Sequence, residues 1–135
     1  MYNLILVRHG QSQWNLENRF TGWYDAELTK QGEEEAQQAG SLIKNLNFDF
    51  NFAFTSFQKR AIFTLKEINK KLNFSIKNIF KAWELNERHY GALQGLNKEV
   101  TAKKHGEQQV KIWRRSYDIP PPPMDKSNQI GRAHV

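Results

Sequence analysis

The sequence predicts an α/β domain in which a parallel-type sheet is flanked by helices. Two apolar segments, residues 3–7 and 48–55, are each followed by turn residues and then by a stretch with helical spacing. A third, less regular segment spans residues 74–82. Strands and helices that alternate with connections this long favour parallel strands covered by helices. The 135 residues suit one domain of this class.

The first predicted strand is Asn3–Val7, because Leu4 to Val7 form a branched apolar run typical of a buried strand. Gly10 marks a tight turn directly behind this run. The stretch that follows is rich in turn residues and predicts an irregular connection; these residues are Asn15, Asn18, Thr21, Gly22 and Asp25.

A helix is predicted to begin after Thr29, whose hydroxyl suits the N-cap position. Residues 33–35 are all glutamates and fall in its early turns, where the helix dipole favours anions. Its buried face is predicted to consist of apolar residues at helical spacing, namely Ala36, Ala39, Leu42, Ile43 and Leu46.

The remaining elements continue the alternation. Phe48–Thr55 is predicted as a strand in which Phe50, Phe52 and Phe54 share one face, and a helix follows over residues 57–72. The other expected elements are a strand at Phe74–Ala82, two short helices at Asn97–His105 and Gln108–Tyr117, and a stiff connector at Pro120–Pro123.

Composition excludes several classes of protein. The chain has no cysteine, which excludes disulfides and thiolate metal sites. No apolar run approaches the length of a membrane span, and the N-terminus lacks the pattern of a signal peptide. We therefore expect a soluble cytoplasmic protein.

Charge is distributed unevenly along the chain. Residues 1–58 hold four Lys and Arg against seven Asp and Glu, whereas residues 59–135 hold sixteen against seven. A basic half suits nucleic acid, an anionic membrane or small phosphorylated ligands, and it also occurs as a lysine-rich surface of biased composition. No basic run is interleaved with aromatic residues, so nucleic acid is not the first choice.

Groups suited to phosphate chemistry follow the first two predicted strands. Arg8 and His9 come after the first strand, while Thr55-Ser56 and Arg60 come after the second. The carboxyl ends of parallel strands meet at one rim of the sheet, where such folds bind ligands. Guanidinium groups match phosphate oxygens, and a neutral imidazole can attack phosphorus. The alternative for each arginine is a surface salt bridge, which contributes little.

A second polar cluster spans residues 85–95. Within it, Glu87 is a candidate general acid or base, and Tyr90 is a candidate hydrogen-bond donor to an anion. Taken singly, a glutamate such as Glu87 is more often a solvated carboxylate than a catalytic group. We interpret His89, and likewise His105, as structural.

Together these motifs resemble the cofactor-dependent phosphoglycerate mutases of the histidine phosphatase superfamily. The resemblance is carried by residues 6–15 (LVRHGQSQWN), 18–23 (NRFTGW), 85–95 (LNERHYGALQG) and 113–115 (WRR), and it extends from residue 2 to about residue 125. Arg8-His9-Gly10 alone would indicate only the superfamily; the longer motifs are specific to the mutase branch.

The resemblance implies that 2-phosphoglycerate and 3-phosphoglycerate are interconverted, in glycolysis and gluconeogenesis, through a phosphohistidine primed by 2,3-bisphosphoglycerate. His9 would carry the phosphoryl group, Glu87 would exchange protons, and Arg8 and Arg60 would hold the transferring phosphate. No metal is expected. The full-length enzyme is expected to be a homodimer or a homotetramer. The expected substrate-binding residues are Ser12, Asn15, Thr21, Gly22, Arg88, Tyr90, Lys98, Arg114 and Arg115.

The chain departs from the family mainly in length. Members continue past the proline run and supply a second histidine in a His-Gly-Asn-Ser turn. We therefore expect residues 1–125 to be the N-terminal part of a single mutase-like domain, with residues 126–135 a non-family tail produced by truncation, and the isolated chain to be poorly folded and impaired in activity. The alternatives are a histidine-type phosphatase and a non-catalytic basic fragment.

Overall fold

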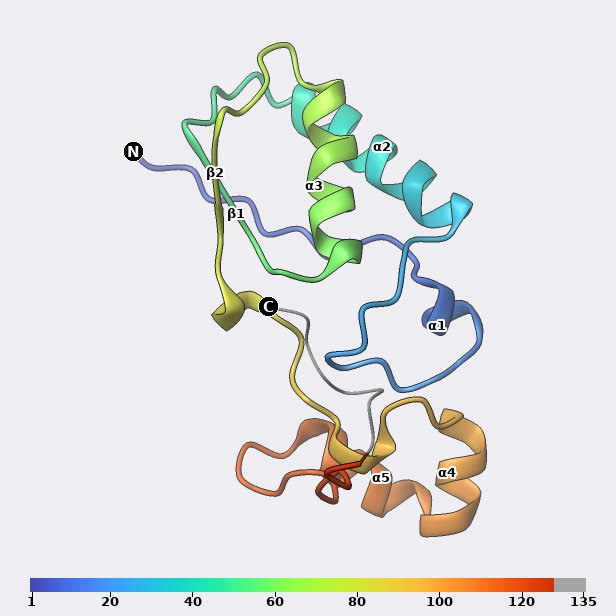
Figure 1. Ribbon diagram of the computed structural model, residues 1–135. Helices are drawn as coiled ribbons and strands as arrows, with labels where there is room; N and C mark the ends of the chain where they lie inside the picture. Colours follow the sequence, from blue (N-terminus) through green and yellow to red (C-terminus); the bar gives the residue numbers. More distant parts are fainter. Residues whose placement is uncertain (128–135) are drawn as a thin grey trace.

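The computed structural model describes residues 1–127 (Figure 1). Two parallel strands, β1 (Phe52–Thr55) and β2 (Asn78–Lys81), pair in register from Phe52 opposite Asn78 to Thr55 opposite Lys81. Helix α3 (Lys59–Lys71) packs between the strands and helix α2 (Lys30–Lys44) (Figure 1). This arrangement confirms the predicted fold class of a parallel sheet flanked by helices.

The prediction of a buried strand at residues 3–7 is wrong. In the described part of the chain this segment joins no strand ladder, and the side chains of Leu4 and Leu6 are 82% and 86% exposed. It lines an apolar hollow together with Phe50, Ala53 and residues of α3. An apolar run becomes a strand only when a neighbour offers hydrogen bonds, and β1 pairs with β2 alone among the described residues.

Helix α2 begins where its cap predicts. The Oγ1 of Thr29 accepts a hydrogen bond of 3.1 Å from the backbone N–H of Gly32, which satisfies one free donor of the first turn. The helix then packs on α3 through small residues, and its buried positions are Gly32, Ala36 and Gly40.

The predicted buried face of α2 is therefore only partly correct. Ala36 is buried, whereas Leu42 and Leu46 are 69% and 50% exposed. A Cβ placed on Gly40 would come within 2.9 Å of the Ile68 Cα on α3. The two helices approach too closely for large side chains, so the small-residue face packs inward and Leu42 lies outside the contact, while Leu46 lies beyond the end of the helix at Lys44.

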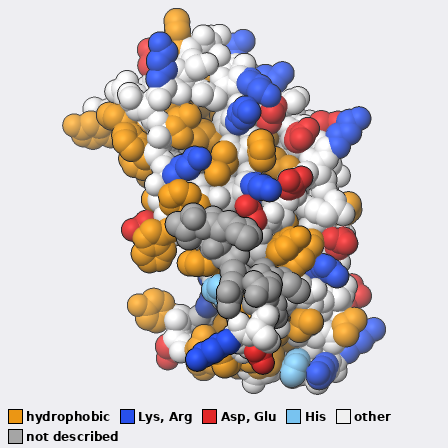
Figure 2. All heavy atoms as spheres, viewed as in Figure 1, with side chains coloured by type: hydrophobic (Ala, Val, Ile, Leu, Met, Phe, Trp, Pro, Cys, Tyr) orange, Lys and Arg blue, Asp and Glu red, His pale blue; other side chains and the backbone are white. Residues whose placement is uncertain are grey.

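The aromatic residues of β1 alternate as predicted, but their shared face points outward. Phe52 and Phe54 are 59% and 66% exposed, and both rings contact Phe80 of β2, with centroids 6.1 and 5.4 Å away. Figure 2 shows hydrophobic side chains gathered on the side of the molecule where Figure 1 places the strands.

The predicted short helices of the second half are α4 (Lys98–His105), capped by Asn97, and α5 (Glu107–Arg115). They enclose a small apolar core in which Phe20, Leu93 and Val110 are buried. Three short elements were not expected from the sequence: α1 (Gln13–Leu16), η1 (Trp83–Leu85) and η2 (Gly91–Leu93).

Within residues 1–127, none of the helices has the length and apolar character needed to cross a membrane. The tail expected at 126–135 falls, from residue 128 onward, outside the described residues. Pro120–Pro123 lies in no helix or strand, as expected for a connector.

Candidate active site

His9 lies half-buried in the turn that follows the N-terminal segment. Its Nδ1 is 2.7 Å from the carbonyl oxygen of Gly10. A carbonyl can only accept a hydrogen bond, so Nδ1 carries the proton of the neutral ring. The lone pair therefore lies on Nε2, which is the nitrogen available to attack an electrophile.

The turn at Gly10 is held between α2 and α3. Its backbone N–H donates to the Oγ1 of Thr64 at 3.1 Å, and that hydroxyl donates to the carbonyl of Arg60 at 2.7 Å. A Cβ at Gly10 would collide with the carbonyl oxygen of Gly32. Only glycine permits this approach, and it places His9 beside the first turn of α3.

His9 opens into a polar cleft of about 530 Å³. The cleft brings together every predicted site residue except Ser12, so residues from distant parts of the chain meet at one place. Its described lining consists of Arg8, His9, Asn15, Arg19, Phe20, Thr21, Gly22, Arg60, Glu87, Arg88, Tyr90, Lys98, Arg114 and Arg115.

Ser12 does not contribute to the cleft, and its predicted role in substrate binding is wrong. Its side chain is fully buried and caps α1, accepting from the backbone N–H of Asn15 at 3.3 Å. Its own N–H and hydroxyl both donate to Asn15 Oδ1. The hydrogen-bonding groups of Ser12 are therefore all used in this reciprocal cap. Asn15 does line the cleft, and its Nδ2 takes no part in the cap.

Arg60 is only 1% exposed and belongs to the first turn of α3. Its Nη1 donates to the carbonyl of Tyr24 at 2.9 Å, and its Nη2 donates to the carbonyl of Gly22 at 2.8 Å. These bonds fix the guanidinium within the cleft wall. Burial lowers the pKa of Arg60, while the charges of Glu87 and Asp25 raise it, so it remains a cation.

Glu87 is fixed through its backbone. Its N–H donates to the Oε1 of Gln58 at 3.0 Å, and its carbonyl accepts from the indole Nε1 of Trp23 at 2.7 Å. Its side-chain Oε1 accepts from the N–H of Arg88 at 3.0 Å. One carboxylate group is thereby presented to a cleft that is otherwise cationic.

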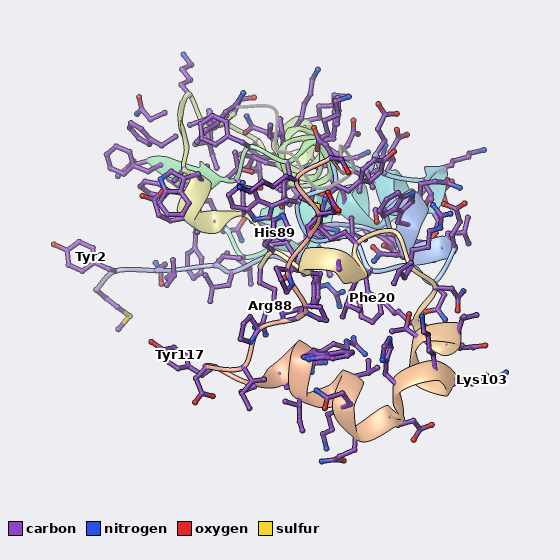
Figure 3. The ribbon with its side chains drawn as sticks, turned by 60° about the horizontal axis from the view of Figure 1, so that its bottom comes forward. Tyr2, Phe20, Arg88, His89, Lys103 and Tyr117 are labelled. Atoms are coloured by element: carbon purple, nitrogen blue, oxygen red, sulfur yellow. The ribbon has the colours of Figure 1, made fainter. Side chains whose placement is uncertain are left out.

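Arg88 borders the cleft but its guanidinium joins two parts of the chain. It donates to the carbonyls of Arg114 at 2.7 Å and Ser116 at 3.2 Å, and it lies over the ring of Tyr90 at 6.0 Å. Figure 3 shows Arg88 where this loop meets the C-terminal helices. The arginine therefore anchors the end of α5 to the loop that carries Glu87.

The far wall of the cleft is built on Phe20. The cationic groups of Lys98 and Arg114 each lie 6.0 Å from the centre of its ring. Burial lowers the pKa of Lys98, and repulsion from Arg114 and Arg8 lowers it further. Cations that repel one another in this way favour binding of an anion, because the anion relieves their repulsion.

Seven lysines and arginines face one carboxylate in the described lining of the cleft. Such a site can bind a ligand with several negative charges. The neutral Nε2 of His9 can serve as a nucleophile, the neighbouring guanidinium groups can stabilise charge on a transferring phosphoryl group, and Glu87 can exchange a proton.

Sequence reasoning named most of these residues but missed two that line the cleft and two that support it. Arg19 and Phe20 line it, and both stand in the Asn18–Trp23 motif already recognised. Gln58 and Trp23 hold Glu87 from behind. No pattern in the sequence signals these last two bonds, because each joins residues far apart in the chain.

We expect His9 to be half-protonated below its ordinary pKa of 6.5. Burial lowers the pKa most, the nearby charges of Arg60 and Arg8 lower it further, and the hydrogen bond to Gly10 and the charge of Glu87 oppose the shift. The nucleophilic form therefore persists to lower pH than in a free imidazole. An NMR titration of the His9 ring checks this, and Glu87→Gln should lower the midpoint further. A midpoint above 6.5 would contradict it.

Comparisons with known proteins agree with the geometry. Residues 4–132 match the family described as the histidine phosphatase superfamily, branch 1. Among solved structures, the chain is similar to the mycobacterial glucosyl-3-phosphoglycerate phosphatase complexed with VO3, with a TM-score of 0.69 and 24% identity over 84% of this chain and 51% of that one.

Two further structures show the same likeness. YhfR of Bacillus stearothermophilus has a TM-score of 0.66 and 25% identity, over 78% of this chain and 50% of its own. TTHB049 of Thermus thermophilus has a TM-score of 0.59 and 30% identity, over 87% and 59% respectively. The chain thus spans about half the length of the first solved structures that it matches. By its sequence and its fold, this chain belongs to branch 1 of the histidine phosphatase superfamily.

Proposed function

We propose that the protein transfers phosphoryl groups through a phosphohistidine on His9. The Nε2 lone pair forms a bond to phosphorus, and the bond from phosphorus to the ester oxygen breaks. Glu87, holding a proton taken up from solvent before this step, gives that proton to the departing alcohol and is left as a carboxylate. The observation that carries the proposal is the Nδ1 hydrogen bond of His9, which leaves Nε2 unprotonated in a cleft lined by cations.

We propose that the reaction is the interconversion of 2-phosphoglycerate and 3-phosphoglycerate. The cleft has cations beyond those that one phosphate needs, which suits an acid with a carboxylate and two phosphates. The charges of Arg8 and Arg60 act on His9 and lower its pKa. These two guanidinium groups would hold the transferring phosphate. Lys98, Arg114 and Arg115 would hold the remaining anionic groups; 2,3-bisphosphoglycerate, when bound, supplies the priming phosphate.

A phosphatase is the second candidate. It is favoured by the likeness in fold to a glucosyl-3-phosphoglycerate phosphatase, whose sequence is 24% identical to that of this chain. In that reaction water, rather than a phosphoglycerate hydroxyl, would take the phosphate from His9. Location in the cytoplasm, a homo-oligomeric state and independence of metal remain predictions alongside either reaction.

One assay separates the two reactions. The complete gene product is incubated with 3-phosphoglycerate, with and without 2,3-bisphosphoglycerate, and both 2-phosphoglycerate and inorganic phosphate are measured. Isomerisation that exceeds phosphate release and requires the primer is the expected result. Phosphate release that needs no primer would establish the phosphatase instead. If neither 2-phosphoglycerate nor inorganic phosphate forms, the proposed phosphoryl transfer is overturned.

A further inference from the structure

A buried glutamine, Gln58, connects two loops that line the cleft, one carrying Gly22 and the other Glu87. The residue is only 6% exposed. Its Nε2 donates to the carbonyl of Gly22 at 2.9 Å, and its Oε1 accepts from the backbone N–H of Glu87 at 3.0 Å. Gln58 is not among the cleft-lining residues, and the reaction proposed above does not use it.

The position of Gln58 makes this use of its side chain unusual. It is the N-cap of α3, yet its side chain makes no hydrogen bond to the first turn of that helix. N-cap side chains usually satisfy those free N–H groups. Here the amide bonds instead to residues 36 positions before it and 29 positions after it. Its interactions therefore serve the loops rather than the helix.

Trp23 makes a second hydrogen bond to the backbone of Glu87. The indole Nε1 donates to the Glu87 carbonyl at 2.7 Å. The two loops are also joined by Gln94, whose Oε1 accepts from the N–H groups of Trp23 at 2.9 Å and Tyr90 at 3.3 Å. The N–H and the C=O of Glu87 are thus both fixed, which sets the direction of its Cα–Cβ bond, and its Oε1 accepts from the N–H of Arg88.

We propose that Gln58 is a positioning residue that aims the Glu87 carboxyl group at the oxygen of the departing alcohol. This role rests on the proposed phosphoryl transfer. The site needs a donor toward Gly22 and an acceptor toward Glu87 on one buried side chain, and an amide supplies both. Loss of the amide would free Glu87 to move, and a displacement of about 1 Å can cost about 100-fold in rate.

The leaving group distinguishes this role from a merely structural one. An alkyl phosphate releases a strongly basic alkoxide unless Glu87 delivers its proton as the bond to phosphorus breaks. p-Nitrophenyl phosphate releases a weakly basic phenolate that departs without a proton. A misaimed Glu87 therefore slows the alkyl ester and spares the aryl ester, whereas general loss of structure slows both.

The test is single-turnover phosphorylation of His9 in the complete gene product, with 2,3-bisphosphoglycerate as the alkyl ester and p-nitrophenyl phosphate as the aryl ester. Gln58→Met keeps the length of the side chain and removes both hydrogen bonds. We expect about a 10- to 100-fold loss with the alkyl ester and less than about 3-fold with the aryl ester. Glu87→Gln should show the same contrast more strongly.

Asn69→Leu is the matched control. Asn69 also lies on α3, and its amide also joins a backbone N–H and a carbonyl, both of Ile76, but it lies outside the cleft. Its loss should lower stability and leave the ratio of the two rates unchanged. If Gln58→Met fails to fold, Trp23→Phe removes the other bond to Glu87 and should give the same contrast.

The outcomes separate this role from the proposed function. Equal loss with both esters, or no loss in either, in the Gln58 variant overturns the role of Gln58 while leaving phosphoryl transfer in place. If Gln58→Met does not fold, the same result in Trp23→Phe overturns it. A wild-type protein that takes phosphate from neither ester overturns the proposed function, and this role with it.

Discussion

Replacing His9 with alanine is expected to abolish incorporation of acid-labile phosphate from radiolabelled 2,3-bisphosphoglycerate. The reason is that Nε2 of His9 is the proposed atom that bonds to phosphorus, and the described lining of the cleft contains no second histidine. Labelling of the complete gene product, followed by acid and base stability of the bound phosphate, measures the effect.

His105→Ala is the control for this experiment. His105 is at the C-terminal end of α4, where its ring packs against that of Trp113 with the centroids 5.1 Å apart, and it does not line the cleft. Its variant should be labelled like the wild type. Labelling that survives in His9→Ala would remove His9 from the proposed mechanism.

Arg60→Met is expected to impair both the reaction and the fold. The charge of Arg60 acts on His9, and loss of one such group that stabilises the transition state typically costs about 10²- to 10³-fold in rate. The same change removes two buried hydrogen bonds to the carbonyls of Gly22 and Tyr24. Hydrogen bonds to charged groups contribute roughly 1.5–3 kcal/mol each, so the unfolding free energy should fall by a few kcal/mol.

Denaturant unfolding and phosphorylation kinetics measure these two effects, and Lys59→Met is the matched comparison. Lys59 is the neighbouring residue, and its ion pair with Glu27, at 3.4 Å, is solvent-exposed. Such a pair contributes about 0–1 kcal/mol. An Arg60 variant as stable and as active as the Lys59 variant would show that the buried guanidinium serves neither purpose.

The predictions from the sequence were correct for features that depend on residues close together in the chain. The Thr29 cap is correct because an N-cap depends only on the residue and the next turn of chain. The helices at α3, α4 and α5 are recognised from spacing within a few turns. The structure also brings the predicted site residues, apart from Ser12, to one cleft, and most of them stand in short contiguous motifs.

The same reasoning failed wherever a distant part of the chain decided the outcome. Leu42 is as apolar as a core requires, yet α2 packs on α3 through its small residues at Gly40 and leaves this leucine exposed. Residues 3–7 have the composition of a strand and no pairing partner among the described residues. Burial and pairing depend on what lies opposite, which a local pattern does not contain.

His9 and Arg60 illustrate how far a sequence argument reaches. We expected them to meet because two parallel strands would end at one rim. They do line one cleft, but His9 is held by the bond from Gly10 to Thr64 and by the contact of Gly10 with Gly32 rather than by a strand.

The sequence by itself determined the family, helices α2 to α5 and which residues are candidates for the nucleophile and the phosphate-binding cations, because these depend on residues close together in the chain. Only the tertiary structure decided which nitrogen of His9 is free, that Ser12 is a cap, and that Gln58 and Trp23 fix Glu87. Hydrogen bonds have direction and short range, so these assignments require atoms placed in space.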